Sequence, residues 1–102
     1  MLELRPTCEH CNEALPPDSD QARICSFECT FCSACVEGVL AGVCPNCGGG
    51  FVARPIRPAH DWKGGNCLAR YPASDRVRHR PVDLDAHAKL VTQLGSIPPA
   101  RR

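Results

Sequence analysis

The segment 25–35 reads CSFECTFCSAC, and it carries four of the nine cysteines of this 102-residue chain. Two further pairs flank it, each with two residues between its cysteines: CEHC at residues 8–11 and CPNC at residues 44–47. Cysteine is therefore concentrated in the first half, and only Cys67 lies beyond residue 47. A cysteine content of about 9% is typical of disulfide scaffolds or metal sites, so these spacings dominate the prediction of the fold.

Two cysteines separated by two residues can bind one ion, because the backbone between them folds into a tight turn, a knuckle, that points both sulfur atoms inward. The same turn directs backbone N–H groups at the sulfurs and helps to hold them as thiolates. In CPNC, Pro45 pre-sets the first turn residue and Gly48 permits a positive φ just after the second cysteine. Eight ligands fill two closed tetrahedral sites, which predicts structural rather than catalytic ions.

The spacing alone leaves open how the eight cysteines divide between two ions. Sequential grouping joins residues 8, 11, 25 and 29 in one site and residues 32, 35, 44 and 47 in the other. Interleaved grouping instead joins Cys8, Cys11, Cys32 and Cys35 in one site and Cys25, Cys29, Cys44 and Cys47 in the other. In both schemes, the short step from residue 29 to residue 32 brings the two sites close together.

Metal ions are expected because this region offers few other sources of stability. Aromatic residues make up only 5% of the chain, so large buried rings cannot supply the core. Each structural zinc ion contributes about 10–16 kcal/mol, and we predict a region that is unfolded without metal. The first six residues, MLELRP, lack the apolar block of a secretory signal, which favours a reducing cytoplasm over a four-disulfide scaffold. Uniform doubling of the ligand pairs favours two Zn²⁺ over iron.

Charge and composition divide the chain at the three glycines 48–50. Residues 1–50, the head, contain two basic and seven acidic side chains, whereas residues 51–102, the tail, contain ten basic and four acidic ones. Six of the ten prolines lie in the tail. We predict a zinc-binding domain over residues 1–50 and a basic, proline-containing tail over residues 51–102. No apolar run approaches the length of a membrane-spanning helix, so no membrane association is expected.

Local patterns predict a few short elements. Alternation predicts a short strand over residues 2–4 and a small hairpin over residues 24–31, with a loop at residues 13–21. Helical spacing predicts a helix over residues 33–41 that Gly42 ends. In the tail, prolines predict an extended segment over residues 54–58. Asp83 is a good N-cap for a predicted helix over residues 84–94, whose apolar stripe needs a partner.

Residues 29–35, CTFCSAC, and the closing CPNC resemble the central run and last knuckle of RING-type zinc fingers. The resemblance covers residues 8–47 and implies the interleaved cross-brace, a treble-clef arrangement in which Cys29 takes the fourth ligand position. LELRP at residues 2–6, ICSFEC at residues 24–29 and RPIRP at residues 54–58 also resemble a small bacterial family of RING-like proteins, a domain of unknown function. That second resemblance reaches about residue 60 and implies no activity.

The features by which RING ligases dock a conjugating enzyme are mostly missing. The resemblance implies an apolar residue in the first knuckle, an aromatic residue in the helix, the closing proline and a basic residue after the last ligand. Pro45 is present, but Glu9 and His10 occupy the first knuckle and Gly48 follows the last ligand. There is also no Trp between residues 35 and 44. We therefore expect no intrinsic catalysis, and a RING-type ubiquitin ligase is kept only as an alternative.

Other candidate residues have simpler interpretations. His10 is expected to be an exposed residue of the first knuckle, because eight thiolates already complete both sites. Cys67 is expected to be a solvent-accessible or loosely packed free thiol, because no histidine of the tail forms a recognisable catalytic arrangement with it. An arginine cluster could contact the phosphates of a nucleic acid. That cluster comprises Arg70, Arg76, Arg78 and Arg80, with Tyr71 nearby.

The charge of the head weighs against the nucleic-acid alternative. Filled with eight thiolates and two Zn²⁺, the head carries a charge of about −9. Docking of the basic tail on this head, or self-association, is therefore favoured at least as well as binding to nucleic acid. The sequence thus predicts a small metal-stabilised α+β fold with two zinc sites, a short hairpin and one short helix, followed by the basic tail with its helix. The predicted function is a cytoplasmic zinc-binding module for contact with another protein, or with a second copy through residues 84–94.

Overall fold

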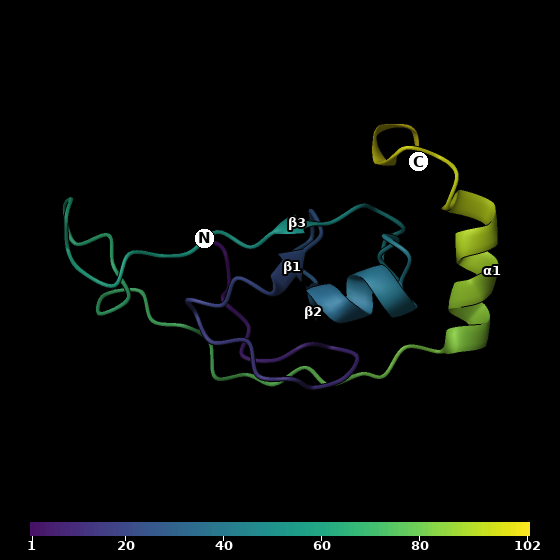
Figure 1. The fold of residues 1–102 in the computed structure, drawn as a ribbon. Coiled ribbons are helices and arrows are strands. Elements are labelled where there is room, and N and C mark those ends of the chain that lie inside the picture. Colours follow the sequence, from purple (N-terminus) through teal and green to yellow (C-terminus); the bar gives the residue numbers. More distant parts are fainter.

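A computed structural model describes all of residues 1–102. The molecule is elongated, with extents of 46 × 27 × 18 Å (Figure 1). Its elements, in chain order, are β1 (Ala22–Ile24), β2 (Thr30–Cys32), the π-helical turn η1 (Cys35–Val39), β3 (Val52–Ala53), the α-helix α1 (Leu84–Leu94) and the 3₁₀ turn η2 (Pro99–Arg101). Most of the chain lies in loops that are fixed by specific hydrogen bonds.

The predicted hairpin is confirmed and gains a third strand from the tail. β1 pairs with β2 in antiparallel register, with Ala22 opposite Cys32 and Ile24 opposite Thr30. β3 pairs with the other side of β1, so the strand order is β2-β1-β3. The sheet therefore joins residues on both sides of the glycines at 48–50.

The predicted helix over residues 33–41 is present in a shorter and wider form. Residues 33–34 are α-helical, and the turn that follows, η1, is π-helical: the N–H of Leu40 donates to the carbonyl of Cys35 at 2.8 Å, five residues back. Gly42 then adopts a φ of +73° and donates to the carbonyl of Val36 at 3.0 Å. This bond satisfies a carbonyl at the helix end, as a C-terminal glycine commonly does.

The predicted strand over residues 2–4 is wrong. No other strand pairs with these residues, which form no regular element. The N–H of Glu3 instead donates to the Glu28 carboxylate at 3.1 Å, and the carbonyl of Leu4 accepts from the N–H of Ser74 at 3.0 Å. Burial does not follow the alternation of apolar and polar residues, because Leu4 and Arg5 are both buried and Leu2 is only half-buried.

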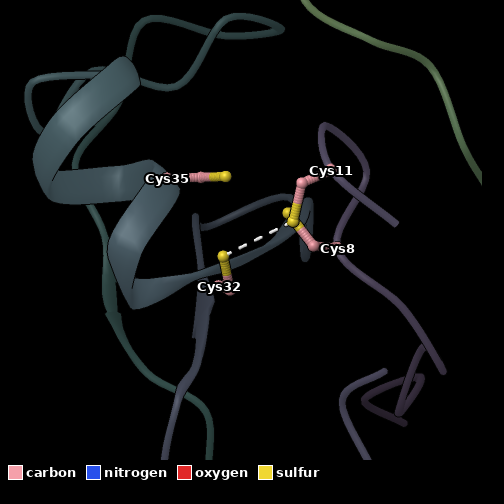
Figure 2. Close-up of side chains that lie close together, drawn as sticks. All are labelled: Cys8, Cys11, Cys32 and Cys35. Atoms are coloured by element: carbon pink, nitrogen blue, oxygen red, sulfur yellow. Dashed lines mark hydrogen bonds between the residues drawn. The ribbon is translucent and has the colours of Figure 1, made fainter. Parts of the chain in front are cut away.

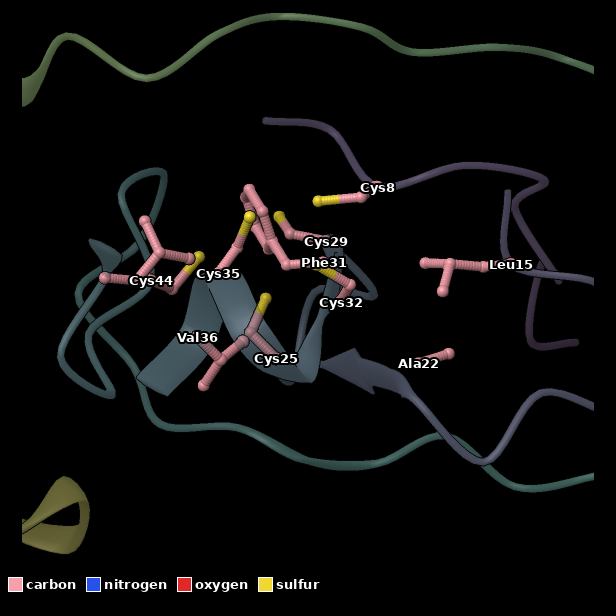
Figure 3. Close-up of a cluster of buried hydrophobic side chains, with 11 residues drawn as sticks. Cys8, Leu15, Ala22, Cys25, Cys29, Phe31, Cys32, Cys35, Val36 and Cys44 are labelled. Carbon is pink, nitrogen blue, oxygen red and sulfur yellow. The ribbon is translucent and has the colours of Figure 1, made fainter. Parts of the chain in front are cut away.

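The core is built largely from sulfur. Six of the eleven residues in the main buried cluster are cysteines (Figure 3). The others are Leu15, Ala22, Phe31, Val36 and Leu40. Phe51 packs against this cluster, and its ring meets that of Phe31 edge-on at 5.6 Å between centroids. With so few large side chains, cysteine side chains make up most of the core.

The tail leaves the sheet, forms a loop at one end of the molecule and returns along the head (Figure 1). We call residues 74–82 of this return the strap. The predicted helix over residues 84–94 is confirmed as α1, and the Asp83 carboxylate accepts from the N–H of Ala86 at 3.1 Å, as expected of an N-cap. Beyond Arg54, only Cys67 and His87 are buried. None of the helices has the length and hydrophobicity needed to cross a membrane.

Candidate metal centres

The first cluster consists of Cys8, Cys11, Cys32 and Cys35, whose sulfur atoms all lie within 4.8 Å of one another (Figure 2). Cys8 and Cys11 come from the first knuckle, where the N–H of Asn12 donates to the carbonyl of Cys8 at 2.9 Å and Asn12 takes a φ of +63°. Cys32 ends β2 and Cys35 begins η1. Two segments that are 21 residues apart therefore face each other through their thiols.

The dimensions of this cluster suit a zinc ion. Four sulfurs placed tetrahedrally at a Zn–S distance of about 2.3 Å are separated by roughly 3.8 Å. The sulfurs of Cys11 and Cys32 lie 3.8 Å apart. All nine cysteines are free of disulfide bonds, so each thiol remains able to bind a metal ion.

The second cluster consists of Cys25, Cys44 and Cys47, whose sulfurs also lie within 4.8 Å of one another. Two backbone N–H groups donate to its sulfurs: that of Gly49 to Cys47 at 3.3 Å and that of Phe27 to Cys25 at 3.3 Å. Gly48 has a φ of +78°, the positive value that its place after the last knuckle cysteine predicts. Such N–H···S bonds are those that hold a knuckle sulfur in its thiolate form.

Cys29 is the one predicted ligand that the structure does not bring into either group. It lies across the hairpin turn from Cys25, whose N–H donates to the carbonyl of Cys29 at 3.2 Å. Its side chain is buried. Burial, with the nearby Cys25 thiol, raises the pKa of Cys29, and the Asn46 side chain acts in the opposite direction. Cys29 thus lies beside the second cluster, and the seven grouped sulfurs follow the interleaved order.

Burial controls the protonation of these thiols when no cation is near. It raises the pKa of Cys32, Cys35 and Cys44 above the ordinary value for a thiol. Burial acts in the same direction on Cys8, but hydrogen bonds to backbone groups outweigh it and lower that pKa. A divalent cation reverses the effect of burial, because it favours the thiolate directly. Metal binding at these clusters would therefore release protons.

Glu9, between the two cysteines of the first knuckle, was not predicted to matter, and it connects all the cysteine segments. Its side chain is only 2% exposed. One carboxylate oxygen accepts from the N–H of Thr30 at 3.1 Å and from Arg5 at 3.2 Å. The other accepts from Asn46 at 3.3 Å and lies 3.5 Å from Arg80. Thr30 lies between Cys29 and Cys32, and Asn46 between Cys44 and Cys47, so Glu9 links the surroundings of both clusters.

Arg54 is a second buried group that sequence reasoning missed. Its guanidinium donates to the carbonyls of Arg5, Leu15 and Pro16 at 2.9, 3.2 and 2.9 Å. Burial lowers its pKa, but a guanidinium stays charged in proteins. Because its partners are backbone carbonyls, no side-chain pattern in the sequence could have revealed it. Arg54 thus holds the segments on both sides of the first knuckle, at residue 5 and at residues 15–16, against the end of β3.

Two of the remaining predictions need correction. Cys67 is 5% exposed and so is buried, not accessible to solvent: the loop of residues 58–71 closes over it, and Tyr71 donates its N–H to the carbonyl of Cys67 at 2.9 Å. His10 is half-buried, and its Nδ1 accepts from the N–H of Val82 at 2.9 Å. Its burial comes from the tail, which lies over the first knuckle.

The arginines that could have contacted nucleic acid are largely engaged within the chain. Arg80 lies 3.5 Å from Glu9, and Arg78 lies 3.9 Å from Glu3. Arg70 lies over the ring of Tyr71, 5.3 Å from its centroid. The tail thus contacts the acidic head, one of the two outcomes that the charge division favoured.

Comparison with known proteins places these cysteines in a family. Residues 1–57 match a family model described as a protein of unknown function, DUF1272. An uncharacterised protein of Rhizobium meliloti (strain 1021) is 58% identical over 74 residues, which cover 72% of this chain and 81% of that protein. No solved structure matches the chain. The family match includes both cysteine clusters, Cys29 and Arg54, and it extends past β3. This chain belongs to the DUF1272 family.

Proposed function

We propose that the head is a RING-like cross-brace that holds two structural Zn²⁺ ions and serves as a platform for contact with another protein. The first ion is held by Cys8, Cys11, Cys32 and Cys35. The second is held by Cys25, Cys44 and Cys47, with Cys29 as its fourth ligand after a small movement of the hairpin turn. Zinc bound by four thiolates has no open position for water or substrate, so no catalysis is proposed.

The geometry of the first cluster is the observation that carries this proposal. Four sulfurs within 4.8 Å, two of them 3.8 Å apart, have the size of a tetrahedral zinc–thiolate site. Buried cysteines make up most of the core, where a protein of this size would otherwise need large apolar side chains. A zinc ion supplies the missing stability and also favours the deprotonated form of these buried thiols.

An interaction role is supported by apolar side chains exposed beside the second cluster. Phe27 is 70% exposed and Val52 is 65% exposed. Next to them, an open groove of about 500 Å³ is lined by four apolar residues and four others. These are Ile24, Phe51, Val52 and Pro99, and Cys25, Ser26, Glu28 and Gly50. Exposed apolar residues that are grouped around a groove are typical of contact surfaces.

The direct test is the metal content of protein made without added metal. Native mass spectrometry with elemental analysis should find two zinc ions per chain. Replacing the metal with Co²⁺ should give thiolate-to-cobalt charge-transfer absorption whose intensity corresponds to four thiolates per ion. A folded chain without metal, or one with disulfide bonds between these cysteines, would contradict the proposal.

A matched pair of variants tests the role of Cys29. Cys29→Ser should weaken zinc binding at the second site by at least tenfold and should lower the charge-transfer absorption by one thiolate. Cys67→Ser, at the other buried cysteine outside the two clusters, should leave both quantities unchanged. Equal effects of the two substitutions would remove Cys29 from the ligand set.

A further inference from the structure

The strap docks on the head as a peptide would, through backbone N–H groups and polar side chains along its length. Ser74 donates its N–H to the carbonyl of Leu4 at 3.0 Å and its hydroxyl to Glu3 at 2.9 Å. Arg78 pairs with Glu3, and Arg80 pairs with Glu9. Ser74, Arg78 and Arg80 thus contact the head, and the strap forms no helix or strand of its own. Figure 1 shows this segment, in green, beside the purple N-terminal segment.

The head presents a matching set of acceptors, which we call the strap-binding surface. It comprises the carboxylates of Glu3 and Glu9, the carbonyls of Leu4, Glu9 and His10, and Nδ1 of His10. The N–H of Arg80 donates to the carbonyl of Glu9 at 2.8 Å, and the N–H of Val82 donates to His10 Nδ1 at 2.9 Å. His79 Nε2 lies 3.2 Å from the carbonyl of His10. Pro81, which has no N–H to offer, falls at a position where the surface uses none.

The strap is held weakly enough to be displaced. The side chain of Arg80 is 70% exposed and that of Arg78 is 40% exposed. Ion pairs with such exposure contribute little to stability, and salt screens them further. No residue of the strap is fully buried, and Val82, at its end, is the one strap side chain that packs against the main buried cluster. Segments with few buried contacts open at a low free-energy cost, so the surface beneath the strap becomes accessible without unfolding of the head.

We infer that the strap-binding surface recognises an extended, arginine-containing segment of another protein, and that the strap is its occupant within the same chain. The inference rests on the proposed function and names the chemistry of the partner. Two arginines separated by one residue meet Glu3 and Glu9. Free N–H groups on the second arginine and on the residue two positions later meet the Glu9 carbonyl and His10. The strap excludes weaker competitors, because a tethered segment has a high local concentration.

The test uses the full, zinc-loaded chain and a labelled peptide that copies residues 72–83. Arg78→Ala with Arg80→Ala loosens the strap without changing the cysteines or Glu9. Fluorescence anisotropy should show saturable binding of the peptide to this double variant. Binding to the unmodified chain, whose strap competes, should be at least tenfold weaker. Adding Glu3→Gln to the double variant should weaken binding by up to about fivefold, because it removes the charge that Arg78 meets.

One control and two further outcomes decide the test. A peptide of the same composition in scrambled order should bind at least tenfold more weakly, and equal binding would overturn the inference by showing attraction of charge alone. Failure of the double variant to bind the peptide while it holds two zinc ions would also overturn it, and would leave the proposed metal sites intact. A chain that forms strap-exchanged dimers in light scattering would assign the surface to a second copy and contradict the choice of partner.

Discussion

The head and the tail are held in shape by opposite means. In the head, cysteines fill the core, and the carbonyls around it are bonded by the buried Arg54, which lies at the start of the tail just after β3. In the tail beyond Arg54, only Cys67 and His87 are buried, and most contacts with the head are hydrogen bonds and exposed ion pairs. On the proposed function, the head therefore depends on the ions that its thiols bind, whereas the tail beyond Arg54 depends on the head.

The contacts of the tail show how this dependence arises. The tail touches the head where the cysteine segments turn: the strap at the first knuckle, His87 at the end of η1, and Arg102 at the second knuckle. His87 donates to the carbonyl of Leu40 at 2.9 Å, and Arg102 lies within hydrogen-bond distance of the carbonyls of Gly42 and Gly48. These carbonyls hold their positions only while the knuckles keep their shape.

Removal of metal should have the largest effect, because it should change both the head and the tail. Loss of about 10–16 kcal/mol per site exceeds the stability of a domain of this size, so the head should unfold. The tail should then lose its docking points, and hydrogen exchange at residues 74–94 should rise together with that of β1 and β2. Chelation followed by exchange mass spectrometry measures this. Re-addition of zinc should restore both regions, and a tail that stays protected without metal would break the comparison.

Replacement of Arg54 should have a smaller effect on stability. That effect acts on the head, whose carbonyls Arg54 bonds. Arg54→Met leaves the carbonyls of Arg5 and Leu15 without a partner, whereas that of Pro16 keeps the N–H of Ser19. The loss should lower the free energy of unfolding by about 3 kcal/mol. Urea unfolding at a fixed free zinc concentration measures the change. Arg23→Met is the matched control, because the bonds of Arg23 lie nearer the surface, at Asp20 and Ala22, and its loss should cost under about 1 kcal/mol. Equal losses would show that Arg54 does not stabilise the head.

The smallest expected effect lies in the tail. Asp83→Ala removes the N-cap of α1 and should destabilise that helix by about 1 kcal/mol. Hydrogen exchange at residues 84–94 should rise about fivefold, and the zinc content should not change. Asp75→Ala, at an exposed residue outside the helix, serves as the control. Loss of zinc on removal of this cap would mean that the tail also supports the metal sites, against the order of dependence described above.

What the sequence could predict is set by neighbouring residues, in the head and in the tail alike. Cysteine spacing, the hairpin and the helix over residues 84–94 are local signals, because ligand pairs, strand alternation and an N-cap are all set by neighbouring residues. The false strand over residues 2–4 shows the limit of such signals. Alternation of apolar and polar residues fits a half-buried strand, but a strand also needs a partner strand, which is absent here.

The contacts that sequence reasoning missed join distant segments through the backbone. Arg54 donates to carbonyls that every residue possesses, so nothing in the side chains of residues 5, 15 and 16 announces it. The strap was foreseen only as a basic segment beside an acidic head. The position of the strap along the head is fixed by N–H groups that donate to the Glu9 carbonyl and to His10. A count of charges cannot predict that position.

The position of Glu9 has a consequence for how the protein takes up its metal ions in a cell. One carboxylate touches Thr30 and Asn46, which lie among the cysteines assigned to different ions. An ion that fixes either group of cysteines therefore also fixes Glu9, and through it the backbone that must bind the other ion. Half-loaded chains should be scarce at every metal supply. The population should change between empty and fully loaded over a narrow range of free zinc, so that the amount of folded protein follows zinc supply almost as a threshold.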